Sequence, residues 1–468
     1  MFIKEYNCFY EIVPLPESIS LSNGSYNLEG PIVIESCSKF KFQSARLKTA
    51  LDFFEIEQGN SEQKIILTQD FSIASEGYSI IVTSNEIKLS ASSTAGITYA
   101  IAALIQMLAI ATTAGKSCFL AISCGTVHST PRLTWRGFML DCARHFRSKE
   151  TIIKLLHVMA HFHYNVFHWH LTDNEAWRTP SKIFPKLNSC GELQDGFYTY
   201  EDITEITAVA KLLNIKIVPE LDLPGHSRHL LKIVPQIGCI NGSNNEVCIG
   251  NYKTRQIISQ LLEEFMELFP ESTEIHLGGD EANSEYWEMC PDCQKALKEK
   301  GLSSIRDLEH DFVLFLIEQV QKTGRKAIVW NDAGIYPADV IVQIWVEKNR
   351  LETLNNGNQV ILSNCSRCYT DRLFDWEIQF DDFQKYVDVQ DNYMFDPYTG
   401  HEDFRKQILG LECCSWGEYL PERRFFYKIM PRLMALSEVC CCDQRQKSWT
   451  SFVKRSARQV ESNCENIW

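Results

Sequence analysis

The chain has 468 residues, of which 45% are hydrophobic and 23% are charged, and its formal net charge at pH 7 is -14. These values indicate a globular protein with room for one large and one smaller domain. Acidic residues outnumber basic ones and no basic block occurs, which argues against a nucleic-acid or anionic-membrane surface, and no run of about 18 uninterrupted apolar residues predicts a membrane span.

The first eight residues show neither a basic start followed by an apolar core nor a small-residue cleavage site. We therefore expect no secretory signal and a cytoplasmic protein. The 18 cysteines are then expected to be reduced, and many lie in apolar runs where a thiol behaves as a small hydrophobe. Two Cys-x-x-Cys pairs, Cys290/Cys293 and Cys365/Cys368, could together hold zinc, but their separation along the chain favours free thiols and no metal. No cofactor is expected.

Residues 1–127 are predicted to form a separate α+β domain. Short β-rich runs at 31–34, 64–67, 78–82 and 86–89 are separated by Ser, Asn and Gly, and the last two flank a turn typical of a hairpin. A long apolar helix is expected near 95–111. No acids, histidines or cysteines cluster here in a catalytic pattern, so a supporting role is the default interpretation.

From residue 128 to 468 the pattern changes to short apolar strands that alternate with amphipathic helices, which predicts parallel β/α units. Eight such units favour a closed (β/α)₈ TIM barrel over an open sheet, and the glycine-rich phosphate fingerprints of nucleotide-binding folds are missing. The eight expected strands cover residues 137–142, 165–172, 216–221, 274–279, 326–331, 340–345, 359–364 and 409–416.

Acids and aromatic residues stand where these strands end, which is where a barrel carries its active site. Flat indole faces stack on the apolar side of a sugar ring, while acids and an arginine bind its hydroxyls. The pattern therefore predicts a sugar site, built from Asp141, Arg144, His170, Asp173, Glu220, Asp222, His226, Asp280, Glu281, Trp330, Asn331, Asp332, Trp345, Tyr369, Asp371, Trp416 and Glu418.

Asp280 and Glu281 are adjacent carboxylates that follow a buried apolar strand and two glycines. The glycines leave room for a ligand or a neighbouring backbone to come close. Two carboxylates this near cannot both ionise freely, so one should have a raised pKa and be able to donate a proton near neutral pH. The simpler interpretation is a solvated acidic pair that opens a helix, and the preceding His276, Gly278 and Gly279 favour the chemical one.

Four motifs in this order give the chain a close resemblance to the β-N-acetylhexosaminidases of glycoside hydrolase family 20. They lie at residues 136–146, 165–173, 218–226 and 276–281. The resemblance covers nearly the whole length, and the first 125 residues match the small domain that precedes the barrel in that family.

The resemblance implies an exo-acting, retaining enzyme that removes a terminal β-linked N-acetylhexosamine, GlcNAc or GalNAc, from an oligosaccharide or glycoconjugate. In that family the 2-acetamido group of the substrate attacks the anomeric carbon and forms an oxazolinium intermediate. The implied roles are proton transfer for Glu281, stabilisation of the acetamido group for Asp280 and Tyr369, and support of Glu281 by Asp173 and His226. The implied substrate-binding residues are Arg144, His170, Trp330, Trp345, Asp371, Trp416 and Glu418.

Three alternatives remain open from the sequence. Enzymes that release a disaccharide share the resemblance, and a catalytically silent carbohydrate-binding protein could use the same fold. A metal-dependent hydrolase would use His276, Asp280 and either His170 or His226, although the usual metal-ligand spacing is missing. Residues 174–178 also depart from the family pattern, so hydrogen bonding behind the pocket is expected to differ, and an acidic, aromatic segment at 375–401 is expected to form a loop on the leaving-group side. The oligomeric state cannot be predicted.

Overall fold

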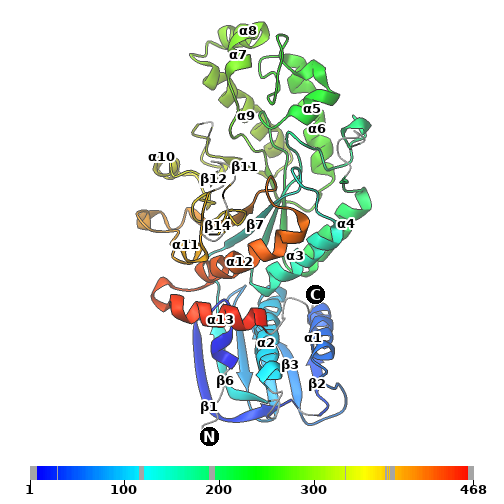
Figure 1. The fold of residues 1–468 in the computed structure, drawn as a ribbon, viewed down its shortest axis with the longest axis vertical. Coiled ribbons are helices and arrows are strands. Elements are labelled where there is room, and N and C mark those ends of the chain that lie inside the picture. The colour runs from blue at the N-terminus through cyan, green and yellow to red at the C-terminus, as the bar shows by residue number, and fades with distance from the viewer. Residues whose placement is uncertain are drawn as a thin grey trace.

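The computed structural model describes residues 8–461 apart from 29, 115–120, 189–194, 333, 375, 376, 378 and 380–384. The chain forms a small sheet domain and a larger barrel, which lie one above the other in Figure 1. The fold predicted from the sequence, a (β/α)₈ barrel preceded by a smaller α+β domain, is confirmed.

The small domain is a six-stranded mixed sheet with the order β1-β6-β4-β5-β3-β2. Helix α2 packs along the sheet and against α1. The sheet contains β1 (Ser18–Asn27), β2 (Val33–Ser36), β3 (Lys64–Gln69), β4 (Tyr78–Val82), β5 (Glu86–Ala91) and β6 (Ala121–Ser129), and the helices are α1 (Lys41–Phe53) and α2 (Thr94–Ala114).

The hairpin expected at 78–89 is present, because β4 and β5 pair antiparallel around a short turn. Sequence reasoning missed α1, β1 and β6. Strand β1 is mostly exposed and rich in serine, so it lacks the alternation of apolar and polar residues that marks a half-buried strand. Strand β6 continues the sheet to Ser129, two residues beyond the expected domain boundary at 127/128.

The barrel closes in the order β10-β11-β12-β13-β14-β7-β8-β9, and all of its strand pairs are parallel. Each strand coincides with one of the eight expected from the sequence, with ends that differ by a few residues. They are β7 (Trp135–Asp141), β8 (Val166–His170), β9 (Lys216–Glu220), β10 (Glu274–His276), β11 (Lys326–Trp330), β12 (Ile341–Ile344), β13 (Val360–Leu362) and β14 (Ile408–Ser415).

Helices surround the barrel, and two of the longer ones begin with reciprocal caps. Thr199 and Asp202 form a capping box at the start of α4, and Ser304 and Asp307 form one at the start of α9. The helices are α3 (Lys149–His161), α4 (Tyr200–Leu212), α5 (Arg228–Ile233), α6 (Tyr252–Glu267), α7 (Glu285–Met289), α8 (Pro291–Lys300), α9 (Ile305–Lys322), α10 (Arg350–Asn355), α11 (Val389–Tyr393), α12 (Phe425–Cys441) and α13 (Trp449–Glu461).

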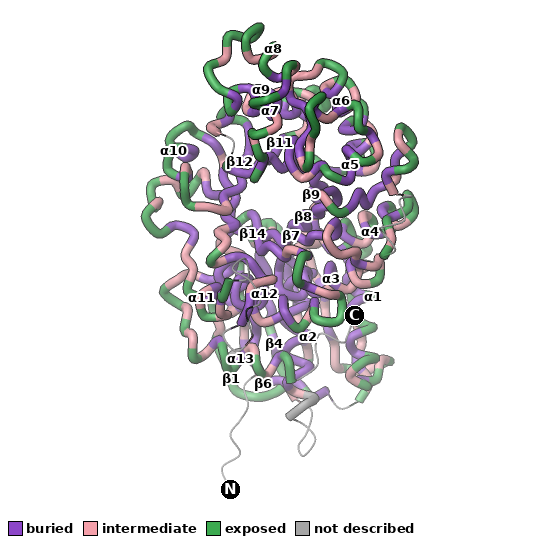
Figure 2. Tube along the Cα trace, turned by 45° about the horizontal axis from the view of Figure 1, so that its top comes forward, coloured by how far each residue is buried: buried purple, intermediate pink, exposed green. Residues whose placement is uncertain are grey.

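The barrel strands are buried along their length, whereas the surrounding helices carry the exposed residues (Figure 2). One layer of the interior is apolar and contains Trp135, Val166, Val218, Ile328, Ile341 and Ile361. Farther along the strands the interior becomes polar, with His168, Glu220, His276, Gln343 and Glu412 all buried. A charged layer therefore separates the apolar layer from the ends of the strands.

Helix α2 contains a window, Thr94–Ala111, that is long and apolar enough to cross a membrane by length and composition alone. In the fold, 89% of this window is buried. Because α2 packs against the sheet on one side and against α3 and α13 on another, its apolar surface belongs to the core of the protein.

The last helix, α13, returns to the junction between the two units (Figure 1). Arg455 of α13 donates to the backbone oxygen of Ile12 at 2.8 Å and forms a buried ion pair with Glu438 of α12 at 2.6 Å. On another part of the junction, Arg136 of β7 pairs with Glu76 of the small domain. Both contacts remove charge from water while keeping it paired, which is the arrangement that buried ions require.

Strand β10 ends at His276, earlier than the sequence suggested, because the next residues leave the extended conformation. Gly278 has φ +67° and Gly279 has φ +96°, both in the left-handed region. A Cβ atom on Gly278 would lie 1.7 Å from Oδ1 of Asp222. The glycine thus lets the end of β10 approach the loop after β9, and this approach brings their acids together.

This close approach predicts that alanine substitution lowers stability by different amounts at two glycines that share one backbone conformation. Gly301, which ends α8, has φ +64° and open space around its Cβ position. Gly301→Ala should cost about 1–2 kcal/mol for the left-handed conformation alone. Gly278→Ala should cost about 3 kcal/mol more, because the methyl group also meets Asp222. Urea unfolding of both variants measures the difference, and equal losses would contradict the crowding at Gly278.

Candidate active site

A pocket of about 850 Å³ opens where the barrel strands end. Its size is ordinary for a site that binds a small molecule. Nine of the residues expected from the sequence line it, namely Arg144, His226, Asp280, Glu281, Trp345, Tyr369, Asp371, Trp416 and Glu418. The remaining three of the twelve residues to which the family resemblance assigns a role, His170, Asp173 and Trp330, are buried and are not among the lining residues.

Asp280 and Glu281 differ sharply in their surroundings. Asp280 is buried, and its Oδ1 atom has no hydrogen-bond partner in the protein. The Glu281 side chain is 59% exposed and faces the same pocket. His226 lies between them, with its Nε2 atom 3.9 Å from Asp280 Oδ2 and 4.0 Å from Glu281 Oε2. One acid can therefore accept a hydrogen bond from a ligand inside the pocket, while the other is placed to exchange protons at its opening.

Glu281 and His226 both have a left-handed backbone, with φ +50° and φ +49°. Side chains other than glycine adopt this conformation at a cost of roughly 1–2 kcal/mol, and such residues gather at functional sites. The Glu281 N–H donates to Asp332 Oδ2 at 3.4 Å, and the other Asp332 oxygen accepts the indole N–H of Trp345. Asp332 thus fixes both the backbone of Glu281 and a wall of the pocket.

Burial raises the pKa of Asp280 well above its usual range, and the nearby carboxylate of Asp222 raises it further. Burial also raises the pKa of Asp222 from 3.8 to about 7. We expected the repulsion to act between the adjacent acids Asp280 and Glu281, but the structure pairs Asp280 with Asp222 instead. The left-handed turn at Gly278 and Gly279 is the reason, because it brings Asp280 beside the loop after β9.

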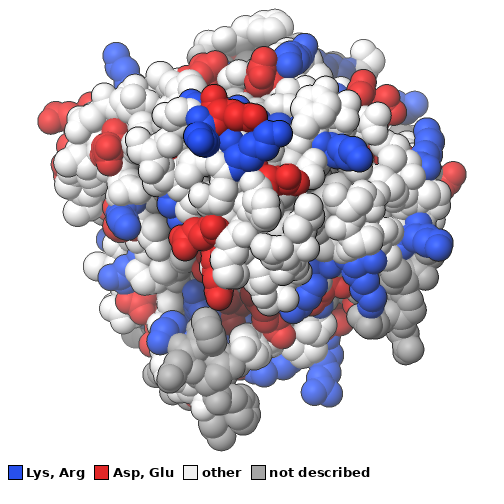
Figure 3. Space-filling view, turned by 90° about the horizontal axis from the view of Figure 1, so that it is seen from above, with Lys and Arg blue, Asp and Glu red and all other residues white. Residues whose placement is uncertain are grey.

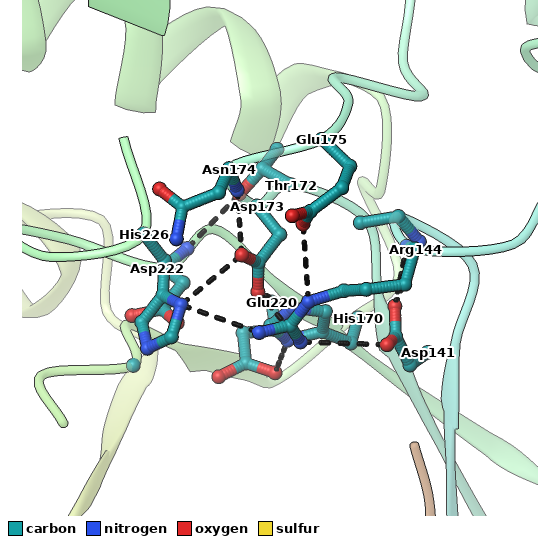
Figure 4. A network of polar contacts seen from close by, with 12 residues as sticks. Asp141, Arg144, His170, Thr172, Asp173, Asn174, Glu175, Glu220, Asp222 and His226 are labelled. Atoms are coloured by element: carbon teal, nitrogen blue, oxygen red, sulfur yellow. Dashed lines mark hydrogen bonds and ion pairs between the residues drawn. The ribbon is translucent and has the colours of Figure 1, made fainter. Parts of the chain in front are cut away.

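A network of paired charges lies behind the pocket (Figure 4). Asp173 accepts from His226 Nδ1 at 3.0 Å and pairs with Arg144 Nη1 at 2.7 Å. Although burial alone would raise it, these two cations hold the pKa of Asp173 well below its usual range. The same contacts keep His226 protonated, since Asp173 and Asp222 raise its pKa despite burial.

His170 continues this network into the barrel. Its Nε2 atom lies 2.9 Å from Asp173 Oδ2 and its Nδ1 atom lies 2.5 Å from Glu220 Oε2, so both ring nitrogens are occupied. The carboxylate of Glu220 raises the pKa of His170 in spite of burial. The sequence suggested that His170 contacts the substrate. The structure instead places it beneath the pocket, where it holds Asp173.

Most of the aromatic side chains expected at the site line the pocket, and one is buried below its surface. Trp345, Tyr369 and Trp416 line the pocket, and the rings of Tyr369 and Trp416 are 6.2 Å apart. Trp330, which was expected to form a wall together with Trp345 and Trp416, is buried with its ring 6.1 Å from that of Trp416 and donates its indole N–H to Glu220 at 3.0 Å. Trp330 therefore supports the floor of the pocket.

Arg144, Asp371 and Glu418 supply the charged edge of the pocket. Arg144 lies over the ring of Trp416, with 5.3 Å from its guanidinium carbon to the ring centre. Burial raises the pKa of Glu418 to about 7, although Arg144 acts to lower it. Burial likewise raises the pKa of Asp371, which accepts the Trp416 backbone N–H at 3.3 Å. This edge offers both donors and acceptors to a polar ligand.

A second, basic wall was not found from the sequence. Arg424 and Lys428 pair with Glu377 on this wall, which also includes Arg372 and Lys385. These residues come from the loop around 372–385 and from the start of α12, so only the fold brings them together. The loop expected over residues 375–401 contributes here, although Trp376 and Phe380 lie outside the described residues.

Residues 174–178, which depart from the resembled family, connect two loops behind the pocket. Glu175 pairs with Arg144 at 3.3 Å and with Arg228 at 2.9 Å, and Asn174 accepts the Arg228 backbone N–H at 3.1 Å. The loop after β8 is thereby tied to the start of α5 (Figure 4 shows the Glu175–Arg144 contact).

The residues proposed for a metal-dependent hydrolase fall into different groups. His276 lies with His168 and Glu220 in the barrel interior, whereas Asp280 lies with Asp222 and His226 at the pocket. A ring nitrogen of each of these histidines already lies within 3.0 Å of a carboxylate oxygen. The arrangement is that of a paired-charge network, and it suits proton transfer and ligand binding.

On the face seen in Figure 3, acidic and basic side chains are interspersed and no broad area of one sign occurs. This distribution leaves no broad basic area on that face.

Two family models together match most of the chain. Residues 133–442 match the catalytic domain of glycosyl hydrolase family 20, and residues 9–128 match domain 2 of that family. A curated β-hexosaminidase of Porphyromonas gingivalis is 28% identical over 97% of this chain, which spans 63% of that relative's length.

Two solved structures have the same overall fold. An exo-β-N-acetylglucosaminidase of Vibrio harveyi, solved with N-acetylglucosamine, aligns with a TM-score of 0.88 and 26% identity over 100% of this chain and 79% of its own. A β-N-acetylhexosaminidase of Bacteroides fragilis aligns with a TM-score of 0.85 and 28% identity over 97% of this chain and 96% of its own.

The raised pKa of Asp222 predicts how stability depends on pH. The folded protein holds this proton more tightly than the unfolded chain does, so ionisation of Asp222 destabilises the fold as pH rises from about 4 to about 7. Asp222→Asn removes that ionisation and keeps an oxygen to accept the Gly279 N–H. Relative to the wild type, the variant should gain about 2 kcal/mol between pH 5 and pH 8.

Urea unfolding at both pH values measures this gain. Asp403→Asn, at an exposed acid on the barrel surface, serves as the control and should show no such gain. A stability difference for Asp222→Asn that is the same at pH 5 and pH 8 would contradict the assignment.

Proposed function

Because the chain belongs to glycosyl hydrolase family 20 and is therefore a glycoside hydrolase, we propose that it removes a terminal β-linked N-acetylhexosamine from the non-reducing end of an oligosaccharide or glycoconjugate. We propose that cleavage retains the anomeric configuration and that the substrate's own 2-acetamido group is the nucleophile. The names of its relatives, β-hexosaminidase and β-N-acetylhexosaminidase, support this substrate class.

One observation carries the proposal: Asp280 and Glu281 are adjacent in sequence but present two different carboxylates to one pocket. The buried, unpartnered Oδ1 of Asp280 is an acceptor that an acetamido N–H would satisfy. Glu281 is accessible enough to reach a glycosidic oxygen and a water molecule. Neither task could be exchanged between the two residues without moving the backbone.

In the first step, the acetamido oxygen forms a bond to the anomeric carbon while the bond from that carbon to the leaving oxygen breaks. Glu281, in its acid form, gives its proton to the leaving oxygen. Asp280 accepts the acetamido N–H and stabilises the positive charge that develops on the oxazolinium ring. Meeting that charge favours the ionised form of Asp280 and so opposes the burial that raises its pKa.

In the second step, Glu281, now a carboxylate, takes a proton from a water molecule as the water oxygen attacks the anomeric carbon. The oxazolinium ring opens, the acetamido group is restored, and Glu281 is again an acid. Because the protonated His226 lies about equally far from both acids, it limits the build-up of negative charge when both are ionised. Asp173 and His170 act through His226 and Arg144 as positioning residues.

The remaining pocket residues would hold the sugar. Tyr369 is buried at the pocket surface, where its hydroxyl can donate to the acetamido oxygen and orient it for attack. Trp345 and Trp416 offer flat faces to the sugar ring, and Arg144, Asp371 and Glu418 offer partners for its hydroxyls. The wall of Arg372, Lys385, Arg424 and Lys428 is left for the leaving group.

We also propose that the protein works in a reducing, cytoplasmic compartment. The 14 cysteines from Cys37 to Cys442 whose side chains the structure describes are free, including the consecutive Cys440, Cys441 and Cys442. Buried thiols that remain unpaired are usual where disulfides do not persist.

The proposed mechanism predicts that the N-acetyl arm is indispensable. An aryl β-GlcNAc glycoside should be cleaved. The matching aryl β-glucoside should react more slowly by a factor of about 10³ or more, because it lacks the internal nucleophile. Aryl β-GalNAc and lacto-N-biose glycosides complete the panel. Equal cleavage of the glucoside would refute the mechanism, and release of the disaccharide in preference to the monosaccharide would reassign the substrate.

Glu281→Gln should lower kcat/KM by about 10³-fold on a substrate with a poor leaving group. The loss should be much smaller on a dinitrophenyl glycoside, whose departure needs little protonation, and this contrast separates proton donation from structural damage. Glu285→Gln, at an exposed glutamate four residues later, is the control and should leave both rates unchanged. An equal loss on both substrates would exclude Glu281 as the acid.

A further inference from the structure

Two pairs of cysteines, separated by 42 residues in the sequence, meet in the core beside the active-site loops. The sulfur atoms of Cys239, Cys248, Cys290 and Cys293 all lie within 4.8 Å of one another. All four residues are buried. Cys248 Sγ is 3.8 Å from Cys290 Sγ and 3.6 Å from Cys293 Sγ, distances well beyond a disulfide bond.

These distances suit a tetrahedral metal centre. Zinc bound by four thiolates has metal–sulfur bonds of about 2.3 Å, which place neighbouring sulfurs about 3.8 Å apart. The four cysteines also supply the closed, all-sulfur ligand set of structural zinc sites, with no position left open for a substrate. We propose that this cluster binds one structural zinc ion.

The local structure holds the ligands in two groups. Cys290 precedes α8 and Cys293 lies in its first turn, so one short segment presents both sulfurs. Cys239 and Cys248 flank a loop that ends just before α6. At Gly250 this loop comes so close to α8 that a Cβ atom would lie 2.4 Å from the Cys293 Cα. Glycine at this position is therefore a condition for bringing the two pairs together.

Hydrogen bonds around the cluster fix its geometry. The Gly250 N–H bonds to the Cys248 sulfur, and the Cys239 N–H donates to Ser243 Oγ at 3.1 Å. Asn251 Nδ2 donates to Asp292 Oδ2 at 2.7 Å, which ties the loop to the start of α8. Supporting bonds of this kind orient the ligands of metal sites and reduce the ordering needed on binding.

This assignment differs from the pairing suggested by the sequence. Cys290 and Cys293 do contribute, but their partners are Cys239 and Cys248, which have eight residues between them, rather than Cys365 and Cys368. Cys365 instead lines the active-site pocket, and Cys368 is buried and does not belong to the four-cysteine cluster.

The zinc ion would join the two loops that carry the chemistry. The loop from β9 contains His226 and is closed by hydrogen bonds from Ser227 N to Asn245 O and from Val247 N to Pro224 O. Glu246 of this loop accepts the Asn283 N–H at 3.2 Å, two residues after Glu281. Metal binding next to these contacts would stabilise both loops without touching the substrate.

The test is the metal content of the full chain purified without chelators or added metal. We expect about one zinc per chain by mass spectrometry of the elements, released when a mercurial reagent blocks the thiols. Protein produced with cobalt should show the charge-transfer and strong visible bands of a tetrahedral four-sulfur site. Absence of metal, with the four cysteines free or joined as disulfides, would overturn the proposal, as would iron in place of zinc.

Matched variants locate the site. Cys290→Ser with Cys293→Ser should abolish zinc binding, whereas Cys365→Ser with Cys368→Ser, which has the same Cys-x-x-Cys spacing, should retain it. If the first variant fails to fold, the cobalt spectrum and the zinc content of the wild-type protein still decide the question. Retention of a full equivalent of zinc by the first variant would refute the assignment.

Discussion

The carboxylate of Glu220, fully buried inside the barrel, sets the constraint on which the site depends. Ring nitrogens of His168, His170, His276 and Trp330 lie 2.5–3.0 Å from its two oxygens. An unpaired carboxylate in this position would cost several kcal/mol, so these rings have little freedom to move. Since the rings come from β8, β10 and β11, one buried charge fixes the relative positions of three strands.

From Glu220 toward the pocket, carboxylates alternate with histidine and arginine side chains. His170 connects it to Asp173, and Asp173 holds the two cations, Arg144 and His226, that border the pocket. Glu220 and Asp173 thus face positively charged or N–H-bearing side chains, whereas Asp280 lies beside another acid, Asp222, which raises its pKa, and has His226 Nε2 3.9 Å away. The site is therefore arranged to accept a positive charge at one place, beside Asp280, where the proposed mechanism creates one.

The sequence was sufficient for the eight barrel strands, because parallel strands buried on both faces leave continuous apolar runs, and for the acids that follow them. It did not show how deeply each of these residues is buried. A strand end such as 165–173 shows that His170 and Asp173 lie near the site, but only the fold shows that both ring nitrogens of His170 are already occupied. Contacts between distant loops were also hidden, including the basic wall from Arg372 to Lys428 and the partners of Cys290 and Cys293.

The position of α13 has a consequence for the integrity of the molecule. Although the barrel strands are complete by Ser415, the chain continues to the sheet domain, where Arg455 bridges Ile12 and Glu438. A cut between the sheet domain and the barrel would separate Arg136 from Glu76, and a cut between α12 and α13 would separate Arg455 from Glu438, so each cut would leave a buried charge without its partner. The two modules should therefore melt in a single cooperative transition, and neither is suited to be produced alone.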